Sequence, residues 1–100
     1  MDKRIDLIIE RLKEVFDPEI PINIYDLGLI YNVDVDKNDN ANIVMTLTAP
    51  GCPVADMLVD EVTQAAKVEG VKNASVELTF DPPWDKSMMS EEARLELGFF

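Results

Sequence analysis

The sequence predicts an α/β domain, a two-layer fold in which a mixed three-stranded sheet carries helices on one face. Segments with apolar residues three and four positions apart alternate with segments in which every second residue is apolar, in the order α, β, β, α, β, α. The helix between the second and third strands predicts a right-handed crossover that makes these strands parallel. A chain of 100 residues suffices for one hydrophobic core, so we expect a single domain over 1–100.

The N-terminal element is predicted to be an amphipathic helix over 3–16 with Asp2 as its cap. Pro18 ends it, because the residue before a proline is forced out of the α conformation. Its apolar stripe consists of Ile5, Ile8, Ile9, Leu12, Val15 and Phe16.

The remaining elements, with a core over 17–84, follow from alternation and turn residues. Strands over 29–36 and 41–48 flank the turn 37–40 and predict a hairpin. A second helix begins near Val54 and ends before Gly70, which fits a left-handed cap. A third strand over 72–80 ends before Pro82, and Ser90 caps a C-terminal helix over 90–97.

Charge and hydropathy exclude several classes of function. The net charge of −11 repels phosphate backbones and anionic lipids, so neither nucleic acid nor a membrane is an expected partner. No apolar run approaches the roughly 20 residues of a membrane span, and no secretory signal is recognisable. We therefore expect a cytoplasmic protein. A single cysteine and no histidine also exclude an internal disulfide and a His-assisted nucleophile.

The one cysteine, Cys52, lies in the stretch TAPGCPVAD at a strand-to-helix bend. Pro53 suits the first helical position, which makes Cys52 the predicted helix cap. Amides and the helix dipole in that position lower thiol pKa values from about 8.5 to between ~3.5 and ~7.5. The alternative is that Cys52 is a small apolar residue filling the corner. A complete metal site would need ligands from outside the chain, because this chain has only one soft ligand.

Carboxylates in the first loop are the second candidate feature. Asp17, Glu19 and Asp26 supply hard oxygen ligands that suit iron, and beside Cys52 they would form a mixed oxygen and sulfur site. The alternative from spacing alone is that the two aspartates cap turns and Glu19 is solvated. Thr48 is a candidate hydrogen-bond donor to a thiolate or ligand, or an ordinary strand-end residue.

A third feature is the aromatic and apolar C-terminal segment. Trp84 follows Pro82 and Pro83 and either anchors the last strand or forms a partner-binding face with Pro83 and Met88. Met88, Met89, Phe99 and Phe100 form an apolar patch that covers the sheet or binds a partner.

The stretches FDPEIPINIYDLGLIY, MTLTAPGCP, DPPW with MMSEEAR, and the closing LGF resemble the SufT-like and PaaD-like family of iron–sulfur maturation proteins. The similarity runs from about Phe16 to Gly98. It implies the α/β fold of iron–sulfur assembly scaffold domains and a functional Cys52. The family motifs fall on Asp17 and Glu19, on Asp26-Leu27-Gly28, on Thr48 and Cys52, and on Pro82-Pro83-Trp84. Ala49 departs from the family pattern, in which Ser or Thr is frequent.

Two functions follow from the resemblance and the residues. The preferred one is a non-enzymatic factor that assembles iron–sulfur clusters or transfers them to apoproteins, with Cys52 as a labile ligand of a cluster or iron and nothing permanently bound. A symmetric homodimer would then contribute two thiolates, with carboxylates or glutathione completing the ligand set. The alternative is a metal-free adaptor between cluster-assembly proteins and client apoproteins. A thiol enzyme or a persulfide carrier is the third option, and the absence of a histidine base argues against hydrolytic chemistry but not against sulfur carriage.

Overall fold

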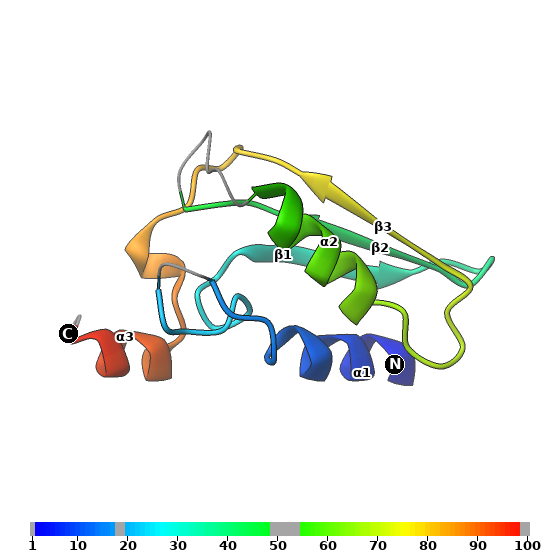
Figure 1. Cartoon of the computed structure of the whole chain (residues 1–100), viewed down its shortest axis with the longest axis horizontal. Helices are drawn as coiled ribbons and strands as arrows, with labels where there is room; N and C mark the ends of the chain where they lie inside the picture. Colours follow the sequence, from blue (N-terminus) through cyan, green and yellow to red (C-terminus); the bar gives the residue numbers. More distant parts are fainter. Residues whose placement is uncertain (1, 18–19, 49–54, 99–100) are drawn as a thin grey trace.

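The computed structural model describes residues 2–17, 20–48 and 55–98 and confirms the predicted fold class. A three-stranded mixed sheet is combined with three α-helices (Figure 1). In chain order the elements are α1 (Lys3–Leu12), β1 (Ile30–Val35), β2 (Asn40–Met45), α2 (Ala55–Ala65), β3 (Asn73–Leu78), the 3-10 helix η1 (Lys86–Met88) and α3 (Glu91–Leu97). No helix within the described ranges has the length and hydrophobicity needed to cross a bilayer.

The sheet has the strand order β1-β2-β3, with β2 in the centre. β1 and β2 form the predicted antiparallel hairpin, with Val33 opposite Ile43, and β3 runs parallel to β2 with Val76 beside Ile43. The face that carries Ile43 and Met45 is buried. The opposite face is polar, and Ser75 donates a hydrogen bond of 2.9 Å there to the side chain of Asn42. One buried face explains the clean alternation of the sequence.

The core forms where α1 and α2 pack against the apolar face of the sheet. Ile8 and Leu12 of α1, and Leu58 and Val62 of α2, are buried and stand four residues apart in each helix. This spacing places both members of a pair on one side of a helix. The predicted cap of α1 is confirmed, because Oδ1 of Asp2 accepts a hydrogen bond of 2.9 Å from the amide of Arg4.

The predicted end of the first helix is wrong. α1 ends at Leu12 instead of Phe16, because the chain after it pairs with the loop that follows. The carbonyl of Val15 accepts a hydrogen bond of 2.8 Å from the amide of Ile24, and Phe16 forms a β-bridge with Asn23. These non-local bonds replace the last turn of helix and leave Phe16 exposed.

The strand ends and the C-terminal helix also differ from the prediction. A bulge between Ile30 and Asn32 interrupts the expected alternation of β1. Ile30 therefore pairs with Met45, a residue of the buried face of the sheet. β2 ends at Met45 instead of Thr48. The capped helix after Ser90 is confirmed, but α3 lies beyond the end of the sheet and covers neither face (Figure 1).

The other end of the molecule is held together by Arg4. Its Nη1 donates hydrogen bonds of 2.7 Å to Oδ1 of Asp39 and 2.8 Å to the carbonyl of Gly70, and its Nη2 lies 2.9 Å from Oδ2 of Asp2. These contacts raise the pKa of Arg4 and the hydrogen bonds from Arg4 lower the pKa of Asp2. Arg4 thereby ties α1 to the hairpin turn and to the loop before β3.

Candidate functional site

The candidate site residues approach one end of the sheet, where β1 begins and β2 and β3 end. Ile30 pairs with Met45 and Met45 with Leu78, and the amide of Thr46 donates a hydrogen bond of 2.8 Å to the carbonyl of Leu29. Asp26 lies three residues before Leu29, and Thr48 lies two residues after Thr46. Figure 1 shows η1 and α3 at the same end of the molecule.

Asp26 is held in a turn by two interactions with Asn23. Its Oδ2 accepts a hydrogen bond of 2.8 Å from Nδ2 of Asn23, and its amide donates one of 2.9 Å to Oδ1 of the same residue. Its carbonyl accepts a further hydrogen bond of 2.8 Å from the amide of Ser90, the cap of α3. The side chain of Asn23 therefore caps the turn before β1, the Asp26 carboxylate holds that side chain in place, and the Asp26 carbonyl joins the turn to the C-terminal helix.

Asp17 is buried, with 9% of its surface exposed. Its Oδ1 accepts a hydrogen bond of 3.3 Å from the amide of Ile20, and its own amide donates one of 3.4 Å to the carbonyl of Ile22. The carboxylate therefore stabilises the loop that folds back onto Phe16. Glu19, the second acid of the predicted loop motif, lies outside the described residues.

Trp84 is anchored to the turn that precedes β1. Its Nε1–H donates a hydrogen bond of 2.7 Å to the carbonyl of Leu27, and its half-buried ring packs against the core. A second bond of 2.7 Å runs from the hydroxyl of Tyr31 to the carbonyl of Pro82. Both bonds attach the segment after β3 to β1, which favours the anchoring interpretation of Trp84.

The other two residues of the predicted partner face are more accessible. Pro83 is exposed, and half-buried Met88 borders a hollow of about 470 Å³ together with Gly28, Ile30, Tyr31 and Pro82. The hydroxyl of Tyr31 lies 3.6 Å from the Met88 sulfur. Met89, by contrast, is buried in the core at 4% exposure. Phe99 and Phe100 lie outside the described residues.

Of the predicted thiol motif, the structure describes Thr48 but not Cys52. Thr48 is half-buried at the end of the second strand region, whereas Cys52, Pro53 and Ala49 lie outside the described residues, so the predicted cap stays a prediction. Within 2–17, 20–48 and 55–98, no three acidic, cysteine or histidine side chains form a group able to hold a metal ion. The three acidic residues that border a hollow of about 190 Å³ beside α3 do not form such a group either; they are Asp26, Glu92 and Glu96.

One polar residue at this end of the sheet, Thr46, is none of the candidate site residues named above. Thr46 is fully buried, and its hydroxyl has no hydrogen-bond partner among the residues that the structure describes. In an alternating strand Thr46 would lie on the opposite face from Met45 and Leu47. It is buried all the same, because the chain is covered on both sides where β2 ends. No signal in the sequence distinguishes it from a solvated strand threonine.

We expect Thr46→Val to raise the free energy of unfolding by about 1 kcal/mol, because a buried hydroxyl without a partner costs roughly 1–3 kcal/mol. Thr63→Val is the matched control. The Thr63 hydroxyl donates a hydrogen bond of 2.8 Å to the carbonyl of Val59, so its loss is expected to destabilise slightly. Urea unfolding measures both variants. A Thr46→Val variant less stable than the wild type would contradict the prediction and indicate that the hydroxyl has a partner.

The fold and these contacts define a small α/β domain in which loops, a buried carboxylate and a Trp-anchored turn meet at one end of a mixed sheet. Residues 5–78 match the model of the family described as iron–sulfur cluster assembly protein, and the chain belongs to this family. This finding confirms the resemblance of the sequence motifs to iron–sulfur maturation proteins.

Individual relatives agree with the family. The chain is 56% identical over 93 residues to an Fe-S protein maturation auxiliary factor of Porphyromonas gingivalis, covering 92% of this chain and 89% of the relative. It is 44% identical over 92 residues to the Fe-S protein maturation auxiliary factor YitW of Bacillus subtilis, covering 91% and 90%. The crystal structure of a domain of unknown function, DUF59, from Bacillus anthracis superimposes with a TM-score of 0.89 at 37% identity, covering 98% of this chain and 94% of that chain.

Proposed function

We propose that this protein is an auxiliary factor in the maturation of iron–sulfur proteins, and that it acts without catalysing a reaction. The observation that carries the proposal is its membership of the iron–sulfur cluster assembly family, together with full-length similarity to relatives named as Fe-S protein maturation auxiliary factors. Iron and sulfide are the cargo in this function. The cluster or iron is bound transiently and passed on to an apoprotein.

Cys52 is the proposed ligand of this cargo. It stands four residues after Thr48 in the sequence, and Asp26 lies at the same end of the sheet as Thr48. A thiolate is the one soft ligand that this chain offers, and iron–sulfur clusters are held by thiolates. We propose that the Thr48 hydroxyl donates a hydrogen bond to bound cargo. Asp17 and Asp26 fix the loops around the site through their hydrogen bonds.

A single cysteine leaves most of the ligand positions of a cluster to other molecules. We propose that a second chain supplies a second thiolate, and that carboxylates or a small thiol such as glutathione complete the set. Incomplete coordination by any one chain makes the cluster labile, which suits a factor that delivers its cargo. The clients are then apoproteins, and the donors are cluster-assembly proteins.

Anaerobic reconstitution with ferrous iron and sulfide tests the proposal. The wild type is expected to gain iron, sulfide and a visible charge-transfer band, and Cys52→Ser is expected to lose at least about nine-tenths of each, because a hydroxyl is a poor ligand for iron. Ser87→Ala, a change in an exposed residue of η1, is the control and should load normally. Equal loading of the wild type and Cys52→Ser would refute the ligand role.

A metal-free adaptor is the second candidate, and the hollow beside Met88 favours it. The hollow of about 470 Å³ is bordered by apolar side chains and lies next to exposed Pro83, as a contact surface for a protein requires. Co-purification of a client apoprotein separates the two functions. Loss of the client with Met88→Asp, combined with full client maturation by Cys52→Ser, would establish the adaptor and exclude the thiolate mechanism.

A further inference from the structure

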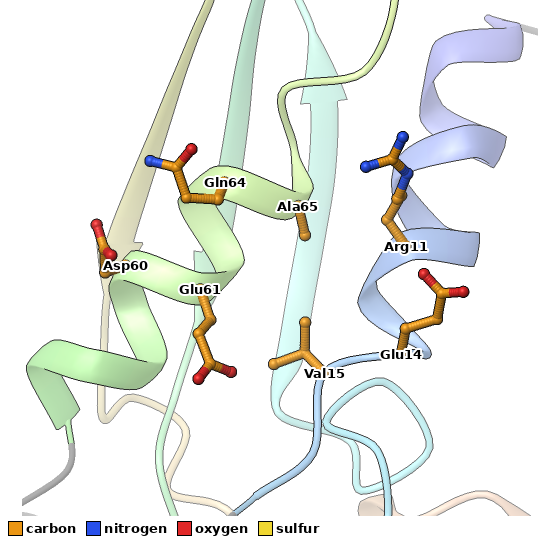
Figure 2. A pocket seen from close by; sticks show the side chains of 7 residues that line it. All are labelled: Arg11, Glu14, Val15, Asp60, Glu61, Gln64 and Ala65. Atoms are coloured by element: carbon orange, nitrogen blue, oxygen red, sulfur yellow. The ribbon is translucent and has the colours of Figure 1, made fainter.

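A groove between α1 and α2 lies on a part of the molecule that the proposed function does not use. It has a volume of about 360 Å³ (Figure 2). Val15 and Ala65 form its apolar floor. Figure 2 shows Glu61 extending from α2 toward Val15, and Glu14 on the opposite side, after the end of α1. The groove therefore combines an apolar base with carboxylates from both of its walls.

The charges around this groove are uncompensated. Its lining contains one positively charged residue, Arg11, and three negatively charged ones, Glu14, Asp60 and Glu61. The net charge of the lining is therefore −2. All four side chains are exposed, and the ion pairs found in the described part of the chain, between Arg4 and Asp2 and between Arg4 and Asp39, involve none of them. The local excess adds to the net charge of −11 of the whole chain. The groove is therefore a favourable position for a cation.

Two exposed apolar side chains stand one helical turn before residues that line the groove. Leu7 is 43% exposed and stands one turn before Arg11 on α1, and Met57 is 55% exposed and stands one turn before Glu61 on α2. Residues four apart share a face of a helix, so both side chains belong to the stripes that border the groove. Large exposed apolar side chains beside an open groove are typical of a surface that another protein covers.

We propose that this groove docks a basic, amphipathic helical segment of a partner protein. The apolar side of such a helix would lie on Val15 and Ala65, between Leu7 and Met57, and its Lys or Arg side chains would reach the carboxylates on the rims. A symmetric contact between two copies fits poorly here, because it would bring the excess negative charge of one groove against the same excess on the other. This interface goes beyond the proposed function, since that function assigns no role to any of the residues that line the groove.

Binding of a defined peptide tests the proposal. The probe is a fluorescein-labelled peptide of about 14 Leu and Lys residues, with Leu spaced three and four apart so that it forms an amphipathic helix. Its affinity for the iron-free wild type is measured by fluorescence anisotropy. Glu14→Gln/Glu61→Gln is expected to weaken binding about tenfold, because each charge contact contributes of the order of 0.7 kcal/mol.

The matched control removes the same amount of charge elsewhere. Asp34 and Glu77 are exposed residues of β1 and β3, on the polar side of the sheet, and Asp34→Asn/Glu77→Gln should weaken binding less than about twofold. Hydrogen exchange should show protection of α1 and α2 by the peptide. A second probe in which Gln replaces every Leu keeps the charge and should bind at least about tenfold more weakly.

Three results would overturn the proposal. Equal weakening by the two variant pairs would mean that the peptide senses only net charge. Equal affinity of the Gln-substituted probe would exclude an apolar contact. A wild-type dimer in sedimentation that Glu14→Gln/Glu61→Gln dissociates would assign the groove to a second copy of the chain. Iron loading should be normal in this variant, so the test is independent of the ligand role of Cys52.

Discussion

Gly28→Ala is expected to lower the free energy of unfolding by about 3 kcal/mol, the sum of about 1 kcal/mol of backbone strain and about 2 kcal/mol of overpacking. Gly28 has a φ of +84°, which side-chain-bearing residues rarely adopt. A Cβ at this position would overlap the carbonyl oxygen of Met88 and lie 2.8 Å from its carbonyl carbon and 2.9 Å from its Cβ. These are mostly backbone atoms of η1, which cannot turn aside as a flexible side chain does.

Gly98→Ala separates the two contributions. Gly98 has a similar φ of +80° at the end of α3, but no atom lies within 4 Å of the Cβ that would be added. The control therefore tests backbone strain alone and should cost about 1 kcal/mol. Urea unfolding at fixed pH measures both variants. If they lost the same stability, the close approach of η1 to Gly28 would have no energetic consequence.

The regular part of the fold was predictable because it depends on periodicity. Apolar residues four apart specify α1 and α2, and alternation around Ile43 and Val76 specifies the strands. The parallel pairing of β2 and β3 follows from a general rule of handedness and needs no information on individual contacts. Short local signals were reliable at Asp2 and Ser90, which both act as helix caps, but not at Gly70, because α2 already ends at Ala65.

Features that depend on contacts between distant residues were not predictable. The bond from the amide of Ile24 to the carbonyl of Val15 ends α1 early, although the helical pattern continues to Phe16. The bulge in β1 and the burial of Thr46 likewise depend on what the rest of the chain places against the strand ends. The groove between α1 and α2 arises from the packing of two helices whose polar faces each resemble ordinary solvated surface.

In the candidate site, too, the residue types were predictable from the sequence, whereas their contacts were not. The sequence motifs predicted site residues that include Asp17, Asp26, Thr48 and Trp84, and the structure shows the hydrogen bonds of three of these four. Asp17 and Asp26 accept hydrogen bonds from loop residues, and Trp84 donates one across the molecule. A motif specifies residue types and order, but it does not distinguish a side chain that holds the site in place from one that touches a ligand.

Trp84→Ala is expected to lower the free energy of unfolding by about 3 kcal/mol, because it removes a large half-buried ring and leaves the carbonyl of buried Leu27 without its 2.7 Å donor. Trp84→Phe keeps most of the apolar contact and should cost only about 1 kcal/mol, the net value of the hydrogen bond. Pro83→Ala, at the exposed neighbouring position, should change stability by less than about 0.5 kcal/mol. Urea unfolding of the three variants distinguishes an anchor from a contact surface. A partner-binding Trp84 without a structural role would leave the stability of both Trp84 variants at the wild-type value, because exposed contact residues contribute to binding and hardly to folding.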